Sequence, residues 1–328
     1  MTPDMDLDAL AARIARELAR ADQIGNWREP AEGGQMGIAN REPGTGNREP
    51  GTENDEQRTA APNASPGVRY VRDNARIAEF IDHTLLKAEA TRADIDQLCS
   101  EALEYEFAAV CVNPVWVPHC AARLQGSRVA VATVVGFPLG ANQSEIKAAE
   151  ASLAVRQGAT EIDMVAAVGH IKGGDWNHVA DDIAAVVRGA AGRLVKVIIE
   201  SAHLTPVEII KASALAREAG AHYVKTSTGF HAAGGATAEA VALMRLVVGD
   251  SMGVKASGGV RDCATALRMI ANGATRIGTS SGVGMAQCLG RGPLPMRELL
   301  ASPQLHHERC ATGACLTNDG TSKTSAVY

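Results

Sequence analysis

Two lysines at the ends of short apolar runs have the clearest chemical potential in this chain. Lys225 lies in Tyr-Val-Lys-Thr-Ser-Thr-Gly (223–229), and Lys255 lies in Val-Lys-Ala-Ser-Gly-Gly (254–259). A solvated lysine has a pKa of about 10.4 and is protonated at neutral pH, but burial and a nearby cation both lower that pKa. A neutral lysine amine attacks carbonyl carbons and forms Schiff bases. We therefore predict amine catalysis, in which one lysine is the nucleophile and the other stays protonated.

Carboxylates accompany the lysines in similar settings. Asp163 lies in Glu-Ile-Asp-Met-Val (161–165), which we take to place it at a strand end, and Asp82 closes the run Ile-Asp (81–82). A carboxylate among Ile, Met and Val needs a cationic partner, because an unpaired buried charge is costly. We expect Asp163 to pair with a lysine directly or through water. The alternative is a purely structural ion pair.

Three further polar residues are weaker candidates for chemistry. Lys196 sits early in its run, and we expect it to extend towards solvent or to pair with Glu200. His83 and Cys111 are expected to fill the core.

Glycine-rich turns follow the last two apolar runs. Ser-Gly-Gly-Val-Arg (257–261) follows the first of them, and Gly-Thr-Ser-Ser-Gly (278–282) follows the second and opens a helix. Glycines let backbone N–H groups approach an anion, and a helix N-terminus favours negative charge. The pair of turns predicts a phosphate site, with ordinary turns as the alternative.

Short β-rich runs alternate with helical segments from about residue 78 onwards, which indicates parallel strands joined by crossover helices. Eight runs are the number that closes a (β/α)8 barrel, in which reactive groups lie at the C-terminal strand ends. A doubly wound sheet is the alternative, but no Gly-x-Gly-x-x-Gly follows the opening strand. The expected strands are 79–82, 108–113, 129–136, 161–165, 194–200, 222–227, 253–257 and 275–278.

The two ends of the chain differ from this pattern. Apolar residues at helical spacing predict an amphipathic helix over residues 5–22. A tract rich in Gly, Pro, Asn, Arg and Glu with a seven-residue repeat follows, and its composition predicts disorder. We expect an extension over 1–70, either dispensable or a tether for a partner, a catalytic (β/α)8 barrel over 71–300 and a flexible tail over 301–328.

The composition limits the classes of function. A net charge of −5 argues against nucleic-acid binding. Seven cysteines without a Cys-x-x-Cys pair, and no secretory leader, indicate reduced thiols and a cytoplasmic protein. No run of 18 apolar residues is present, so we expect no membrane partner. The spacing of His306, His307, Cys310 and Cys315 matches no tight zinc pattern, so we expect no metal.

Eight ordered motifs between residues 78 and 290 resemble those of the deoxyribose-phosphate aldolase family. They are Ile-Asp-His-Thr-Leu-Leu-Lys (81–87), Val-Asn-Pro (112–114), Val-Val-Gly-Phe-Pro-Leu-Gly (134–140), Glu-Ile-Asp-Met-Val (161–165), Lys-Val-Ile-Ile-Glu (196–200), Lys-Thr-Ser-Thr-Gly-Phe (225–230), Lys-Ala-Ser-Gly-Gly-Val-Arg (255–261) and Arg-Ile-Gly-Thr-Ser-Ser (276–281).

The resemblance implies a class I, metal-independent and cofactor-free aldolase on a (β/α)8 barrel. Such enzymes interconvert 2-deoxy-D-ribose 5-phosphate with D-glyceraldehyde 3-phosphate and acetaldehyde. It implies that Lys225 forms the Schiff base, that Lys255 transfers protons and perturbs Lys225, and that Asp163 works with a water. It also implies that substrate and phosphate are bound by Asp82, Thr226, Gly229, Gly258, Gly259, Val260, Arg261, Gly278, Ser280 and Ser281.

One position departs from a branch of the family. Phe230 stands where that branch has a lysine, so one phosphate-binding cation is missing. Two alternatives remain: another Schiff-base aldolase or transaldolase, and a non-catalytic barrel that binds sugar phosphates. We expect a homo-oligomer, such as a dimer.

Overall fold

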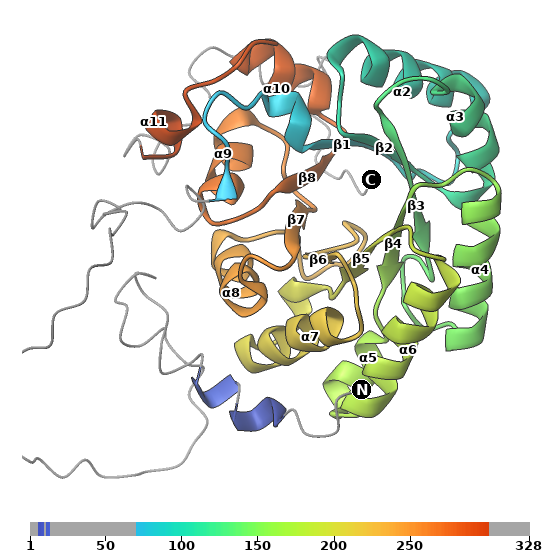
Figure 1. Cartoon of the computed structure of the whole chain (residues 1–328), viewed down its shortest axis with the longest axis vertical. Coiled ribbons are helices and arrows are strands. Elements are labelled where there is room, and N and C mark those ends of the chain that lie inside the picture. Colours follow the sequence, from blue (N-terminus) through green and yellow to red (C-terminus); the bar gives the residue numbers. More distant parts are fainter. Residues whose placement is uncertain (1–5, 10, 14–69, 302–328) are drawn as a thin grey trace, which may run out of the picture.

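Eight parallel strands form a closed barrel inside a ring of helices (Figure 1). The computed structural model describes residues 6–9, 11–13 and 70–301. The strands follow chain order around the barrel, which closes where Ile81 pairs with Ile277. They are β1 Ile81–Leu85, β2 Ala109–Val112, β3 Ala130–Val135, β4 Glu161–Val165, β5 Leu194–Ile198, β6 Tyr223–Lys225, β7 Gly253–Ser257 and β8 Arg276–Thr279. The expected barrel is confirmed, and the doubly wound sheet is excluded.

Several of the helices between the strands begin at a residue whose side chain caps the helix N-terminus. The hydroxyls of Thr91 and Thr205 each accept a backbone N–H of the first turn in a capping box, and Asp262 caps a third helix. The α-helices are α2 Arg92–Tyr105, α3 Val117–Arg123, α4 Ser144–Arg156, α5 Val168–Gly173, α6 Trp176–Gly189, α7 Pro206–Glu218, α8 Ala238–Val248, α9 Cys263–Ala271, α10 Gly282–Leu289 and α11 Met296–Ala301. Short 3-10 helices are η2 Ile77–Phe80, η3 Pro114–Trp116 and η4 Ser201–His203.

The first strand is shifted from its expected place. Residues 77–80 form η2, and β1 begins only at Ile81. The Glu79 carboxylate accepts the backbone N–H of Arg76, which favours a helical turn here over an extended strand. Asp82 is consequently the second residue of β1, and the expectation that it closes a strand is wrong. At the other end of the barrel, β5 stops at Ile198, because Glu200 has a left-handed backbone.

Alternation along the strands separates the apolar core from the charged interior. Val195, Val197, Val224 and Val254 are fully buried in the apolar core cluster. Lys196, Lys225 and Lys255 are the neighbours of these valines along the strands. Successive side chains of a strand face opposite sides of the sheet. The covering helices thus bury the apolar face, while the barrel axis receives the charged face.

Part of the predicted N-terminal helix is described. Residues 7–9 and 11–13 are helical, and Ala11 is buried in the core cluster. The Asp8 carboxylate accepts from Lys211 of α7 at 2.5 Å. The rest of the 5–22 helix, the low-complexity tract and the 302–328 tail lie outside the described residues, so the expected domain boundaries stay predictions. Along the described part of the chain, no helix combines the length and the apolar character needed to cross a bilayer.

Candidate active site

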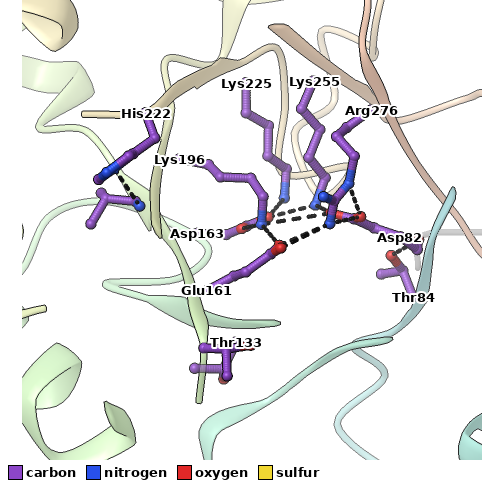
Figure 2. A network of polar contacts seen from close by, with 12 residues as sticks. Asp82, Thr84, Thr133, Glu161, Asp163, Lys196, His222, Lys225, Lys255 and Arg276 are labelled. Carbon is purple, nitrogen blue, oxygen red and sulfur yellow. Dashed lines mark hydrogen bonds and ion pairs between the residues drawn. The ribbon is translucent and has the colours of Figure 1, made fainter. Parts of the chain in front are cut away.

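Seven ionisable side chains from six strands meet inside the barrel. Figure 2 shows the lysines of β5, β6 and β7 pointing towards carboxylates of β1 and β4, with an arginine of β8 beside them. Six of the side chains are buried and the arginine is 11% exposed. The group, called the ion network below, consists of Asp82, Glu161, Asp163, Lys196, Lys225, Lys255 and Arg276.

Asp163 is the centre of the ion network. Its Oδ2 accepts from Lys225 Nζ at 2.8 Å and from Lys255 Nζ at 2.7 Å, and its Oδ1 accepts from Lys196 Nζ at 2.6 Å. Burial alone would raise the pKa of Asp163, but the three ammonium groups hold it well below its usual range. Asp163 is therefore a carboxylate at neutral pH, with each of its oxygens held by a lysine.

Asp82 and Glu161 connect the lysines to the arginine. Asp82 accepts from Lys255 Nζ at 2.5 Å and from Arg276 Nε at 2.6 Å. Glu161 lies 2.9 Å from Arg276 Nη2 and 2.6 Å from Lys196 Nζ. Burial would raise the pKa of Asp82, yet Arg276 and Lys255 lower it far below its ordinary value. These carboxylates keep the neighbouring cations charged.

The charges of the ion network do not balance when every group is ionised. Three lysines and an arginine face three carboxylates, so one positive charge is in excess. Loss of one lysine proton removes this excess, and the cost of burying net charge favours that loss. The count alone does not say which lysine is deprotonated.

The surroundings of each lysine settle that choice in favour of Lys225. Burial is the largest cause that lowers the pKa of Lys225, Asp163 opposes it, and the neighbouring Lys255 lowers the pKa further. For Lys255, burial is outweighed by Asp163 and Asp82, and its pKa is raised. For Lys196, Asp163 and Glu161 likewise outweigh burial and raise the pKa. Lys225 is thus the one lysine of the ion network whose pKa is lowered.

Several sequence-based placements need correction. Asp163 is the third residue of β4 rather than its end, whereas Lys225 does end β6. The expected pairing of Lys196 with Glu200 is wrong, because Lys196 points into the ion network. Glu200 instead accepts from Thr228, at 2.6 Å from the hydroxyl. The left-handed backbone of Glu200 takes it out of the alternating pattern, so its side chain no longer shares a face with Lys196.

The sequence reasoning missed Glu161 and Arg276 as members of the ion network. A signal for Glu161 was present, since it lies two residues from Asp163 on the same strand and hence on the same face. Arg276 is the first residue of β8 and carried no comparable signal. Cys111 and His83 are buried, as expected. Burial raises the pKa of the Cys111 thiol.

The glycine turns after β7 and β8 lie side by side with the turn after β6. Ser257 pairs with Gly278, and a Cβ at Gly278 would lie 2.4 Å from Ser257 Oγ. Gly258 and Gly259 have φ values of 84° and 77°, a conformation that suits glycine. The loop residue Gly235 touches Gly258 so closely that a Cβ there would be 2.1 Å from the Gly258 oxygen.

The other residues predicted to bind substrate are distributed over these turns. The Thr226 hydroxyl donates to the Ser257 carbonyl and accepts its N–H, both at 3.0 Å, which ties β6 to β7. Arg261 and Ser280 are exposed, and Ser281 precedes the first turn of α10. Phe230 packs edge-on against Phe137, with ring centroids 5.1 Å apart. Of the remaining candidates, Val260 is buried and Gly229 is half-buried.

Two buried hydroxyls next to the turns lack partners. Among the described residues, the Oγ atoms of Ser227 and Ser257 are enclosed without a hydrogen bond. Buried polar groups are usually satisfied. Ser257 ends β7, and Ser227 lies two residues after the end of β6, so both hydroxyls lie close along the chain to the two lysines.

Known proteins resemble this chain over the barrel. A family model described as DeoC/LacD family aldolase matches residues 76–289. A deoxyribose-phosphate aldolase from Geobacillus sp. (strain WCH70) is 59% identical over 212 residues, which cover 64% of this chain and 95% of the relative.

Solved structures agree with this result. A putative deoxyribose-phosphate aldolase from Coccidioides immitis has a TM-score of 0.63 and 43% identity, covering 64% of this chain and 84% of that one. The deoxyribose phosphate aldolase from Aeropyrum pernix, described as having a unique tetrameric structure, has a TM-score of 0.61 and 32% identity, covering 69% and 96%. The resemblance seen in the sequence motifs is confirmed, and the chain belongs to the DeoC/LacD family of aldolases.

Proposed function

We propose that this aldolase is a deoxyribose-phosphate aldolase, which cleaves 2-deoxy-D-ribose 5-phosphate reversibly to D-glyceraldehyde 3-phosphate and acetaldehyde. The observation that carries the proposal is the lowered pKa of Lys225 beside Asp163 and Lys255. A relative that aligns with this chain over 95% of its own length is named deoxyribose-phosphate aldolase.

The first step is attack by Lys225. Its neutral Nζ adds to the C1 aldehyde carbon of the open-chain sugar, and loss of water gives a protonated imine. Lys255, whose pKa is raised, is an ammonium before this step and donates a proton to the departing hydroxyl, which leaves as water. Lys255 is then neutral until the final hydrolysis returns its proton. Asp163 balances the positive charge that the imine retains, since the carboxylate remains ionised.

The second step breaks the bond between C2 and C3. A proton leaves the C3 hydroxyl, its O–H electrons form the carbonyl of glyceraldehyde 3-phosphate, and the C2–C3 electrons move into the imine to give an enamine. Asp163 accepts the proton directly or through a water. General base help of this kind contributes about 10²–10⁴-fold to the rate.

The last step returns the enzyme to its starting state. The enamine carbon takes up the proton that Asp163 accepted, and water then hydrolyses the protonated imine to acetaldehyde and neutral Lys225. The proton released by this hydrolysis returns to Lys255. Both protons stay within reach of the Asp163–Lys255 pair, whose Oδ2–Nζ distance is 2.7 Å.

The turns after β6, β7 and β8 are proposed to hold the substrate phosphate. Backbone N–H groups of Gly258, Gly259 and Gly278 and the hydroxyls of Ser280 and Ser281 would surround it, with Arg261 as the cation. Phe230 supplies no charge, so we propose that phosphate binding here depends more strongly on Arg261. Asp82 is proposed to act through Lys255 instead of touching the sugar, because both of its oxygens are held by cations.

A donor-specificity assay tests the proposed reaction. The purified chain is incubated with glyceraldehyde 3-phosphate and acetaldehyde, dihydroxyacetone or pyruvate, and product formation is followed by mass spectrometry. Only acetaldehyde should give product. Product from dihydroxyacetone would favour a transaldolase, product from pyruvate would favour a keto-acid aldolase, and no product from any donor would favour a binding protein.

We further propose a homo-oligomer in the cytoplasm, with a dimer as the simplest form. A solved relative from Aeropyrum pernix is described as tetrameric. Cys99, Cys111, Cys120, Cys263 and Cys288 are free thiols in the described part of the chain, which suits a reducing compartment. Light scattering coupled to size-exclusion chromatography measures the assembly, and a monomer at micromolar concentration would contradict it.

A further inference from the structure

Two histidines and an aspartate meet where α5 gives way to α6. His170 lies in α5, Asp175 caps α6, and His178 lies in the first turn of α6. One ligand atom from each side chain lies within 4.8 Å of the other two, and within the described residues no other group of His, Cys, Asp and Glu shares this property. All three residues lie outside the ion network.

The cluster is held in place by its own contacts. Asp175 Oδ1 accepts the backbone N–H of His178 at 3.2 Å, and Asp175 Oδ2 lies 3.1 Å from His170 Nδ1. The two imidazole rings stack with centroids 3.6 Å apart. The sequence thus fixes one carboxylate oxygen at the helix start and directs the other towards the histidines.

The spacing suits a shared metal ion. Metal–ligand bonds of about 2.0–2.1 Å in a tetrahedral site place the ligand atoms roughly 3.3 Å apart. The Asp175 Oδ2–His170 Nδ1 distance of 3.1 Å is a hydrogen bond here, and a metal ion would take the place of its proton. The third ligand atom, from His178, lies within 4.8 Å of the other two, and the His178 ring must turn out of its stacked position to direct that nitrogen at the ion.

The ligand types and exposure of the residues suit the same role. A carboxylate oxygen and a neutral imidazole nitrogen are both ordinary ligands of first-row transition metals. His170 and Asp175 side chains are 47% and 54% exposed, which leaves room for an ion and for water ligands.

We propose that His170, Asp175 and His178 form a surface site for a divalent first-row transition metal such as Zn²⁺, with water completing the coordination. Two imidazoles select Zn²⁺, Ni²⁺, Cu²⁺ or Co²⁺ over Mg²⁺ and Ca²⁺, which prefer oxygen ligands. The bound ion joins α5 to α6 directly after the strand that carries Asp163. The site is separate from the aldol chemistry.

Calorimetric titration of the full-length chain with Zn²⁺ tests the proposal. The tail residues His306, His307, Cys310 and Cys315 are first replaced by alanine or serine, so that they cannot contribute ligands. One Zn²⁺ should bind per chain, and Mg²⁺ should give no heat at this site. His170→Ala and His178→Ala should each weaken Zn²⁺ binding about tenfold or more.

Two matched variants separate ligation from folding. Asp175→Asn keeps a good helix cap but loses the anionic ligand, so Zn²⁺ affinity should fall while the melting temperature without metal stays constant. His119→Ala is the control, because it removes a histidine that also lies beside a carboxylate but outside the proposed site. His119 contacts Asp96 at 3.0 Å, and its other ring nitrogen faces Arg92. The His119→Ala variant should bind Zn²⁺ as tightly as the chain without this substitution.

Electron paramagnetic resonance of the Cu²⁺-loaded chain gives an independent readout. The spectrum should show coupling to two imidazole nitrogens in the chain with the tail residues replaced, and to one nitrogen when His178→Ala is added to it. Zn²⁺ affinity unchanged by both histidine substitutions, or a Cu²⁺ spectrum without nitrogen coupling, would overturn the proposal. The donor-specificity assay is independent of this site, so failure of either idea leaves the other standing.

Discussion

Lys225 and Lys255 are register partners on neighbouring strands, and their ammonium nitrogens share one oxygen, Asp163 Oδ2, at 2.8 and 2.7 Å. The shared oxygen brings two like charges close together in a buried site. Asp82 contacts Lys255 at 2.5 Å, and no contact between Asp82 and Lys225 is seen among the described residues. Two lysines in equivalent strand positions therefore have pKa values shifted in opposite directions, because Lys255 has a second carboxylate partner besides Asp163.

Lys225→Ala should abolish both turnover and covalent capture of the aldehyde. Removal of a nucleophile costs on the order of 10⁴-fold or more in kcat. Intact-mass spectrometry after acetaldehyde and borohydride should show one added ethyl group on the parent chain and none on the variant. Lys211→Ala, a change on α7 outside the barrel interior, is the control and should label normally. The same mass increase on Lys225→Ala as on the parent chain would refute the assignment.

Lys255→Leu should shift the pH dependence of the rate to higher pH. The substitution removes a cation that lowers the pKa of Lys225. It also frees Asp163 from its contact with Lys255, so that Asp163 raises the pKa of Lys225 more strongly. The acidic limb of the kcat/KM profile reports this pKa in the free enzyme. Lys255→Arg keeps the positive charge, so it should slow the reaction with a smaller shift of the limb. An acidic limb of Lys255→Leu that coincides with that of the parent chain would contradict the electrostatic role.

Asp82→Asn should destabilise the fold by about 3–5 kcal/mol at neutral pH, because Lys255 and Arg276 lose a buried partner. The pKa of Asp82 is lowered in the folded state from an ordinary value of 3.8. Its stabilising effect is therefore complete above about pH 4 and is lost as pH falls through the lowered pKa. Urea unfolding of the parent chain and of Asp82→Asn should show a difference in the free energy of unfolding that becomes smaller as the pH is lowered.

The control for that measurement is Asp181→Asn, since Asp181 is exposed on α6. This change should alter the unfolding free energy by less than about 0.5 kcal/mol. A gap between the parent chain and Asp82→Asn that is constant from neutral to acidic pH would show that Asp82 is not ionised in the folded chain.

Gly235→Ala should weaken phosphate binding without affecting the lysine. The new Cβ would lie 2.1 Å from the Gly258 oxygen, so the turn after β7 must move. KM for deoxyribose 5-phosphate should rise about tenfold, equivalent to about 1.4 kcal/mol. Borohydride trapping with acetaldehyde, which has no phosphate, should be unchanged. Gly292→Ala is the control, because nothing lies within 4 Å of its Cβ position. An equal loss of trapping and phosphate binding would mean that the turn supports Lys225 itself.

Thr228→Val should disturb the segment that follows Lys225. The Thr228 hydroxyl donates to Glu200 at 2.6 Å and accepts from the Phe230 N–H at 3.1 Å. Loss of a hydrogen bond to a buried charged group costs about 1.5–3 kcal/mol, and kcat/KM should fall with the unfolding free energy. Thr228→Ser keeps the hydroxyl and should restore both quantities. A Thr228→Ser variant as impaired as Thr228→Val would point to lost packing of the methyl group instead.

The sequence by itself determined the architecture and the main reactive groups. Short β-rich runs that alternate with helical segments indicated eight parallel strands, because the composition of each run and segment is a local property. The same local signals placed Lys225 at the end of β6 and the two glycine turns after β7 and β8. The resemblance added the family, which the matched relatives confirm.

Only the tertiary structure decided which charges meet. Lys255 of β7 reaches Asp163 of β4 across the barrel, and Arg276 of β8 reaches Asp82 of β1 where the sheet closes. Neither contact follows from the local sequence, because closure and strand stagger bring together residues that are distant along the chain. For the same reason Lys196 was misassigned to Glu200. The lowered pKa of Lys225 depends on burial and on the balance of charges in the closed interior, which no single strand contains.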